Sequence, residues 1–187
     1  MFRLLSIDPG STNMGFTVFE VTAMDQPMNI LHTSTLNVER LAKLMYGESM
    51  MYYHGLRQAK MQICHEAVFK LLHAWEITYV VSESPYMSRF PQAYGALMEC
   101  LMSIRQAVMR YHPDLPLALV DPASVKLSVG VKGNSGDKNH MTAAVAKLYG
   151  HQVNVQHLDE HSIDSIAVGH AWQKQETQQF LNFLEMR

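Results

Sequence analysis

The sequence predicts an α/β fold in which a mixed five-stranded sheet is flanked by helices. The chain opens with two apolar runs joined by a tight Pro-Gly-Ser-Thr-Asn turn, which indicates a β-hairpin. Further on, short β-branched runs alternate with long stretches of helical periodicity, which adds strands and covering helices. With 187 residues, 48% of them hydrophobic, we expect residues 1–187 to form a single domain with one substantial core.

The opening hairpin spans residues 4–19, and its first strand ends at Asp8. A carboxylate at the end of a buried strand is costly unless a cation or hydrogen-bond donors replace its lost hydration. Asp8 is therefore a candidate metal ligand. The alternative, which this stretch favours equally, is that Asp8 only caps the turn through the local backbone.

Three further strands are expected. Residues 28–38 alternate apolar and polar side chains and would complete an antiparallel meander with the hairpin. Residues 79–83 form a β-branched run that ends in a second carboxylate, Glu83, and residues 117–120 form a short fifth strand. We expect the first and fourth strands to lie side by side with their ends pointing the same way.

The spacing of apolar residues predicts the helices. They cover residues 40–75 with interruptions at Gly47 and Gly55, residues 91–110, a short stretch after Asp121, residues 137–149, and residues 162–178. The second of these helices carries an extra stripe of small residues, namely Ala93, Ala96, Cys100 and Ala107. That stripe suits either a helix-on-helix interior or a contact between two copies of the chain.

Composition limits the classes of function. The formal net charge is -2, so a nucleic-acid surface has to be a local cluster of basic residues. The two cysteines, Cys64 and Cys100, fall within apolar helical patterns, which favours free buried thiols in a reducing compartment. No apolar run approaches the roughly 18–20 residues that span a bilayer. We therefore expect a soluble, intracellular, cytoplasmic protein without a membrane partner.

Acidic residues from distant segments are expected to meet at one edge of the sheet. Asp8 and Glu83 end neighbouring strands, and His161 and Asp164 are three residues apart, so they share one helix face. Three carboxylates and an imidazole suit a pair of Mg²⁺ or Mn²⁺ ions, which activate water for in-line phosphodiester hydrolysis. The alternative is that Asp159, Glu160 and Asp164 only favour the positive end of the helix dipole.

Two features are typical of a nucleic-acid surface. Between residues 126 and 147, four lysines (Lys126, Lys132, Lys138 and Lys147) flank a glycine-rich loop and predict a phosphate-binding edge, although solvated lysines are the simpler interpretation. Tyr86 and Phe90 follow Glu83 and would stack on unpaired bases; an aromatic lid over the core is equally favoured.

Four blocks of the sequence together resemble the RuvC family of Holliday-junction resolvases. Ile7–Gly15, reading IDPGSTNMG, resembles the first family motif, and Val81-Ser82-Glu83 with Tyr86 resembles the second acidic motif and its junction-inserting aromatic residue. Residues 125–133 with Asp137-Lys138 resemble the lysine-bearing third region, and residues 161–170 resemble the terminal motif. The similarity covers roughly residues 3–172, in family order.

The resemblance implies an RNase H-like fold, a homodimer with two active sites, and Mg²⁺- or Mn²⁺-dependent nicking of branched DNA, including four-way junctions and flaps. It assigns Asp8, Glu83, His161 and Asp164 to a quartet that binds two metal ions in each active site. It places Lys126 and Lys138 at the scissile phosphate and Tyr86 at the opened base pairs of the junction. The helix from Pro91 would supply the dimer contact.

The chain also departs from the family pattern. Residues 41–55 are longer and richer in Met and Tyr than in cellular resolvases, and Ser84-Pro85 stiffens the chain beside Glu83. A histidine at position 161 leaves one carboxylate fewer, which shifts the metal preference toward Mn²⁺ and leaves open whether His161 is a ligand or a general base. These departures are compatible with a phage- or virus-type resolvase of broader branched-DNA specificity.

Three other functions compete with the resolvase. A related nuclease that acts on RNA or RNA–DNA hybrids would share the fold and the metals. An ATP-binding protein of the actin-like or sugar-kinase fold would also begin with an acidic hairpin, but 187 residues leave little room for its second domain. A non-catalytic junction-binding protein would not need clustered carboxylates, which repel phosphate.

Overall fold

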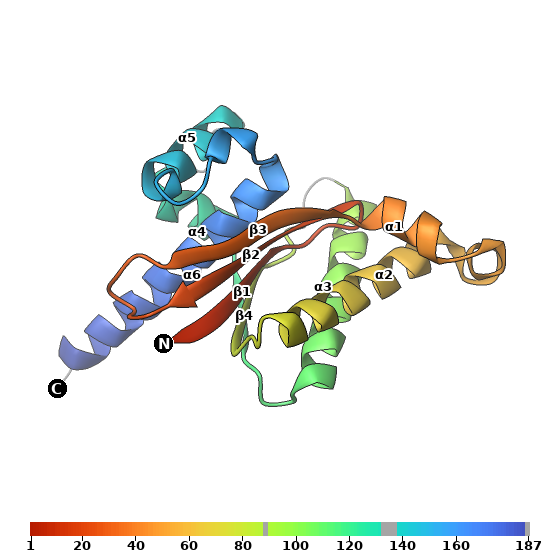
Figure 1. The fold of residues 1–187 in the computed structure, drawn as a ribbon, viewed down its shortest axis with the longest axis horizontal. Helices are drawn as coiled ribbons and strands as arrows, with labels where there is room; N and C mark the ends of the chain where they lie inside the picture. The colour runs from red at the N-terminus through yellow and green to blue at the C-terminus, as the bar shows by residue number, and fades with distance from the viewer. Residues whose placement is uncertain (88–89, 132–137, 186–187) are drawn as a thin grey trace.

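The computed structural model describes residues 1–87, 90–131 and 138–185. Its central element is a sheet with the strand order β3-β2-β1-β4-β5 (Figure 1). The strands are β1 (Phe2–Asp8), β2 (Asn13–Val21), β3 (Asn29–Asn37), β4 (Tyr79–Glu83) and β5 (Leu117–Val120). The pairs β1–β2 and β2–β3 are antiparallel, whereas β4 pairs in parallel with β1 and β5. The predicted mixed five-stranded sheet, with the first and fourth strands adjacent, is confirmed.

Helices cover both faces of this sheet (Figure 1). They are α1 (Val38–Met45), α2 (Glu48–Ala74), α3 (Pro91–Tyr111), α4 (Pro122–Ser128), α5 (Lys138–Tyr149) and α6 (Glu160–Glu185), with a short 3-10 helix η1 (Val155–His157). One apolar core lies between the sheet and α1–α3, and a second lies between the sheet and α4–α6. Among the described residues, no helix is long and apolar enough to cross a membrane.

Successive side chains of β1 point alternately into the two cores. Ile7 packs in the core under α1–α3, whereas Leu4 packs in the core under α6. Because strand side chains alternate with a period of two, Ser6 and Asp8 share the α6 face with Leu4. The hydroxyl of Ser6 lies against α6, where it donates to the backbone carbonyl of Ser165 at 2.6 Å.

The long helical stretch predicted for residues 40–75 is broken at the two expected glycines. The chain leaves helical geometry at Tyr46 and Gly47, between α1 and α2. Within α2, Gly55 adopts φ 77° and ψ 160°, a left-handed conformation that costs glycine little because it lacks a Cβ atom. Both predicted interruptions are confirmed.

Helix α6 extends beyond the predicted range of 162–178 at both ends. The Asp159 carboxylate accepts a hydrogen bond from the backbone N–H of Ser162 at 3.0 Å, so Asp159 caps the helix and α6 begins at Glu160. At the other end α6 continues to Glu185. The sequence did not predict η1, and the predicted helix start at Asp137 lies outside the described residues.

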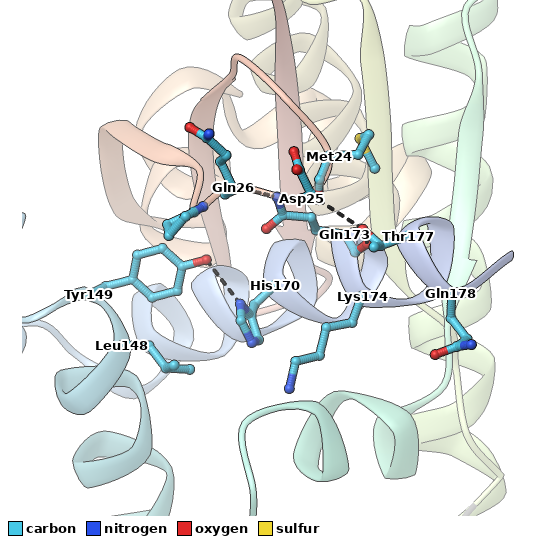
Figure 2. Close-up of a pocket in the computed structure, with 11 residues that line it drawn as sticks. Met24, Asp25, Gln26, Leu148, Tyr149, His170, Gln173, Lys174, Thr177 and Gln178 are labelled. Carbon is cyan, nitrogen blue, oxygen red and sulfur yellow. Dashed lines mark hydrogen bonds between the residues drawn. The ribbon is translucent and has the colours of Figure 1, made fainter. Parts of the chain in front are cut away.

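The C-terminal half of α6 is fixed to the β2–β3 hairpin. Gln173 Nε2 and Thr177 Oγ1 donate to the backbone carbonyl of Met24, at 3.1 and 2.8 Å. Gln173 also donates to the carbonyl of Gln26 at 2.5 Å. These residues line a pocket beside the helix (Figure 2), far along α6 from its first turn.

The two cysteines are free and buried, as predicted. Cys64 on α2 and Cys100 on α3 have Sγ atoms 3.5 Å apart. Cys100 and Ala107, two members of the small-residue stripe, lie in the core that α3 shares with α2. For these two residues the helix-on-helix interpretation of the stripe is confirmed.

The start of α6 lies directly on the backbone of β2. A Cβ atom built on Gly15 would be 1.9 Å from the carbonyl oxygen of His161 and 2.4 Å from its carbonyl carbon. Both clashing atoms belong to the backbone, so they cannot move aside as a flexible side chain would. Glycine at position 15 therefore permits α6 to approach the sheet this closely.

We expect Gly15→Ala to displace the first turn of α6 and to lower the free energy of unfolding by about 1–3 kcal/mol, as overpacking does. Denaturant unfolding of the full chain measures this loss. Gly47→Ala is the matched control, because a Cβ atom there meets no atom within 4 Å. Equal stability of Gly15→Ala and Gly47→Ala would contradict the close approach.

Candidate active site

The structure places Asp8 and Glu83 together at one edge of the sheet. The parallel register of β1 and β4 pairs Ile7 with Ser82, so the next residues along the two strands are neighbours. Each of these acids ends its strand. This edge, at the carboxyl ends of parallel strands, is where open α/β folds usually bind ligands.

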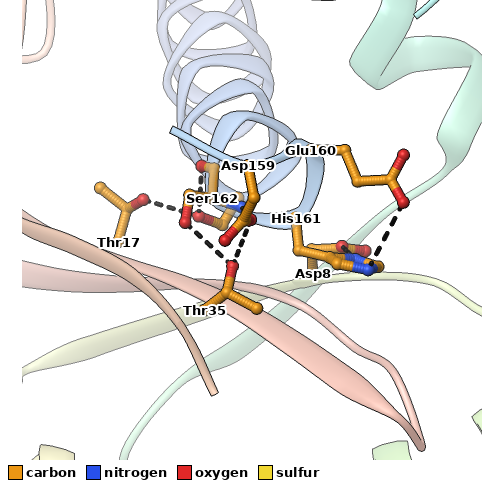
Figure 3. Close-up of polar contacts among 8 residues, drawn as sticks. Asp8, Thr17, Thr35, Asp159, Glu160, His161 and Ser162 are labelled. Atoms are coloured by element: carbon orange, nitrogen blue, oxygen red, sulfur yellow. Dashed lines mark hydrogen bonds and ion pairs between the residues drawn. The ribbon is translucent and has the colours of Figure 1, made fainter. Parts of the chain in front are cut away.

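The first turn of α6 brings His161 to the same edge. His161 Nδ1 donates a hydrogen bond to Asp8 Oδ2 at 2.9 Å (Figure 3). Its other ring nitrogen, Nε2, lies 3.7 Å from Glu160 Oε1. The hydrogen bond to Asp8 raises the pKa of His161, although partial burial of the ring opposes this effect. His161 therefore lies between two carboxylates that favour its charged form.

Burial and neighbouring negative charges raise the pKa of three carboxyl groups at this edge. Burial raises the pKa of Glu83 to about 8, and the charges of Asp8 and Asp164 add to the effect. Burial, and then the charge of Asp8, raise the pKa of Asp164 to about 7. Burial also raises the pKa of Asp8, although its hydrogen bond with His161 acts in the opposite direction. The cluster therefore holds protons near neutral pH, and a bound cation would relieve its internal repulsion.

Lys126 supplies positive charge beside the cluster. It lies in the last turn of α4. Its ammonium group lowers the pKa of both Glu83 and Asp164 against the larger effects that raise them, so it lies within electrostatic reach of each. The structure thus brings together the five residues that the sequence predicted as catalytic, namely Asp8, Glu83, Lys126, His161 and Asp164.

The donor atoms suit hard divalent cations. Mg²⁺ prefers carboxylate oxygens, and an imidazole is compatible with Mn²⁺. Within the ranges that the structure describes, however, no three His, Cys, Asp or Glu side chains are arranged to hold a metal ion. The Asp8 carboxylate is engaged by His161 instead. The fit to a metal therefore rests on the donor types and their repulsion, and a cation would compete with the Asp8–His161 hydrogen bond.

The predicted nucleic-acid contacts are placed only in part. Tyr86 and Phe90 follow β4 with exposed fractions of 69% and 71%. Both rings are thus largely exposed, so the alternative of an aromatic lid over the core is wrong. Lys132 lies outside the described residues, and of Lys138 only the backbone, at the start of α5, is described.

The residues that fix α6 to the sheet are not predicted by the sequence pattern. The sequence predicts Asp159 only as a partner of the helix dipole, whereas in the structure it caps the helix and also accepts a hydrogen bond from Thr35 Oγ1 at 2.5 Å (Figure 3). Ser162 and Ser165 follow His161 and Asp164 directly and bond toward the strands. The available signal was the run of Ser and Thr at strand positions that share a face with Asp8.

The raised pKa of Glu83 predicts a pH-dependent effect on stability. Its pKa lies above the usual glutamate value of 4.5, so ionisation of Glu83 destabilises the folded state. This destabilisation is nearly absent below about pH 4.5 and complete above about pH 8. Glu83→Gln removes this cost, and we expect it to raise the free energy of unfolding at pH 9 by on the order of 2–4 kcal/mol, with little change at pH 5.

Denaturant unfolding without divalent cations, at pH 5 and pH 9, measures this difference. Glu48→Gln, which changes an exposed glutamate at the start of α2, should alter stability by less than about 1 kcal/mol at either pH. A Glu83→Gln chain that is less stable than the wild type at pH 9 would show that ionised Glu83 is not under repulsion.

Comparison with known proteins finds similarity in sequence and in fold. No protein-family model matches the chain. The crossover junction endodeoxyribonuclease RuvC of Campylobacter hominis is 25% identical over 169 residues, which cover 90% of this chain and 95% of that protein.

Solved structures show the same fold. RuvC of Thermus thermophilus in complex with a Holliday junction substrate superposes with a TM-score of 0.67 at 16% identity, covering 90% of this chain and 91% of the other. The yeast mitochondrial Holliday junction resolvase Ydc2 gives a TM-score of 0.68 at 14% identity, covering 98% and 83%. The strand order and these structures together show that the chain has the RNase H-like fold of the RuvC-type resolvases, to one of which its sequence is also similar.

Proposed function

We propose that the chain is a divalent-metal-dependent, structure-selective DNA endonuclease that resolves Holliday junctions by paired nicks. The observation that carries this proposal is the convergence of Asp8, Glu83, Asp164 and His161 beside Lys126. Three clustered carboxyl groups with raised pKa values lower stability when they ionise and repel phosphate, so a protein that only binds junctions gains nothing from them. The likeness to RuvC supports a DNA junction as the substrate.

The reaction would be in-line hydrolysis of a phosphodiester bond. Asp8, Glu83 and Asp164 would hold two Mg²⁺ or Mn²⁺ ions, which supply water activation and charge neutralisation when bound. Lys126 would stabilise the negative charge that develops on the scissile phosphate. Because Nδ1 of His161 is bonded to Asp8, His161 would act through Nε2, either as a metal ligand or as a general base.

The branched region of the DNA would be recognised beside this site. Tyr86 is three residues beyond Glu83, and three extended residues span at most about 11 Å, so its exposed ring is within reach of bases next to the cleaved bond. A ring in this position would stack on bases that the junction leaves open. Lys132 and Lys138 would contact the phosphate backbone.

Paired nicks in opposing strands require two active sites, so we propose a homodimer with two-fold symmetry. Helix α3 is the proposed contact. It exposes Met102 and Met109, while its small residues Cys100 and Ala107 are already used in packing against α2. Large exposed apolar side chains on a helix are typical of surfaces that a partner covers.

The direct test is cleavage of a labelled four-way junction beside a linear duplex, a flap and an RNA–DNA hybrid, with Mg²⁺ or Mn²⁺. We expect symmetric nicks in the junction and slower cutting of the duplex. Asp8→Asn should keep the fold and junction binding but abolish cleavage, because it removes a charged cation ligand from the cluster.

Asp25→Asn is the matched control, since it makes the same chemical change at an exposed position of the hairpin that joins β2 to β3. We expect this variant to cut junctions at the wild-type rate. Undiminished cleavage by pure Asp8→Asn would refute the site, and faster cutting of RNA–DNA hybrids than of junctions would refute the substrate.

A further inference from the structure

Hydroxyl groups join the start of α6 to the sheet, beside the apolar core in which Ile163 packs. Thr17 on β2 and Ser165 on α6 are completely buried, and their Oγ atoms lie 2.7 Å apart. Thr17 Oγ1 is also 2.9 Å from Thr33 Oγ1 on β3. A second link runs through Thr35 on β3, whose Oγ1 is 2.9 Å from Ser162 Oγ (Figure 3). We define these five residues with Ser6 and Asp159 as the hydroxyl network.

The direction of the first link follows from the number of protons, because each hydroxyl carries only one. Ser165 donates its proton to the backbone carbonyl of Ser162 at 2.8 Å, so Thr17 must be the donor in the Thr17–Ser165 pair. Thr33 must then donate to Thr17. This link is therefore ordered from β3 through β2 to α6.

The direction of the second link is fixed in the same way. Thr35 donates to the carboxylate of Asp159 at 2.5 Å, which leaves Ser162 as the donor in the Thr35–Ser162 pair. The same carboxylate accepts the backbone N–H of Ser162 and so caps the helix. This link ties the helix cap and the first turn of α6 to β3.

The network and the candidate active site use adjacent faces of one helical turn. Ser162 follows His161 and Ser165 follows Asp164, and one residue corresponds to a rotation of about 100° around the helix. A rotation of α6 that moved His161 and Asp164 would therefore break the bonds of both serines. Hydrogen bonds are directional, so they resist such a rotation in addition to the surrounding packing.

We propose that Thr17 and Ser165 are positioning residues, which set the rotation of α6 and thereby the approach of His161 and Asp164 to Asp8 and Glu83. This inference rests on the proposed nuclease function. Stability alone does not require the buried pair, because replacing both partners of a hydrogen bond by apolar groups of similar shape is nearly neutral. Next to Thr17 on the same strand face, Phe19 packs against α6 through apolar contacts only.

The test is the double variant Thr17→Val/Ser165→Ala in the full chain. We expect kcat for junction cleavage to fall about tenfold or more, while KM for the junction and the melting temperature stay close to wild type. We also expect weaker Mn²⁺ binding in calorimetry, since the ligands on α6 are less well placed. Thr17→Ser keeps the donor and should retain kcat.

Thr177→Val is the matched control. It makes the Thr→Val change on the helix that carries Ser165 and removes the bond to the Met24 carbonyl (Figure 2), but Thr177 lies sixteen residues, or about 24 Å, from His161. We expect this variant to keep wild-type kcat and Mn²⁺ affinity. Wild-type kcat in the folded double variant, or an equal loss in Thr177→Val, would overturn the inference.

Two outcomes remain informative if the main comparison fails. If the double variant does not fold, Thr35→Val breaks the second link and should show the same loss of kcat; a folded Thr35→Val chain with wild-type kcat would overturn the inference. If the wild-type chain cuts no junction, the proposed function fails, and Mn²⁺ affinity still tests positioning. Equal Mn²⁺ affinity of the wild type, the double variant and Thr177→Val would then overturn it.

Discussion

The structure depends on the docking of the first turn of α6 onto β1 and β2. Gly15 lets the backbone of β2 touch that of His161, and Ser6 anchors the carbonyl of Ser165. This contact joins residues more than 140 positions apart in the chain and completes the candidate site. Without it, the two strand-end acids would lack His161 and Asp164, and the apolar core under α6 would open to water. Fold and site therefore share one interface.

The same interface carries a cost. It brings acids from β1, β4 and α6 together, where burial and mutual repulsion raise the pKa of Glu83 to about 8 and that of Asp164 to about 7. A protein under selection for stability alone would place apolar residues there. The arrangement is explained if divalent cations occupy the site during function, because they replace the protons and remove the repulsion.

Much of the fold can be predicted from local sequence patterns, but the hydroxyl network cannot. Strand ends at Asp8 and Glu83 and breaks at Gly47 and Gly55 are visible because periodicity and glycine act over a few residues. The predicted start of α6 was wrong because the polar residues from Asp159 to Ser162 show no apolar periodicity. The cap that Asp159 provides is recognised only from its hydrogen bond to the backbone N–H of Ser162. The pairing of Thr17 with Ser165 depends on tertiary contact, which no short-range pattern encodes.

The acids of the candidate site hold protons that a bound cation should displace. Calorimetric titration with Mn²⁺ at pH 7, in two buffers of different ionisation enthalpy, measures protons released on binding. The account predicts release on the order of one proton per chain at pH 7, almost none at pH 9.5, and less at pH 7 from Glu83→Gln. Binding without proton release at pH 7, or equal release from Glu83→Gln, would contradict it.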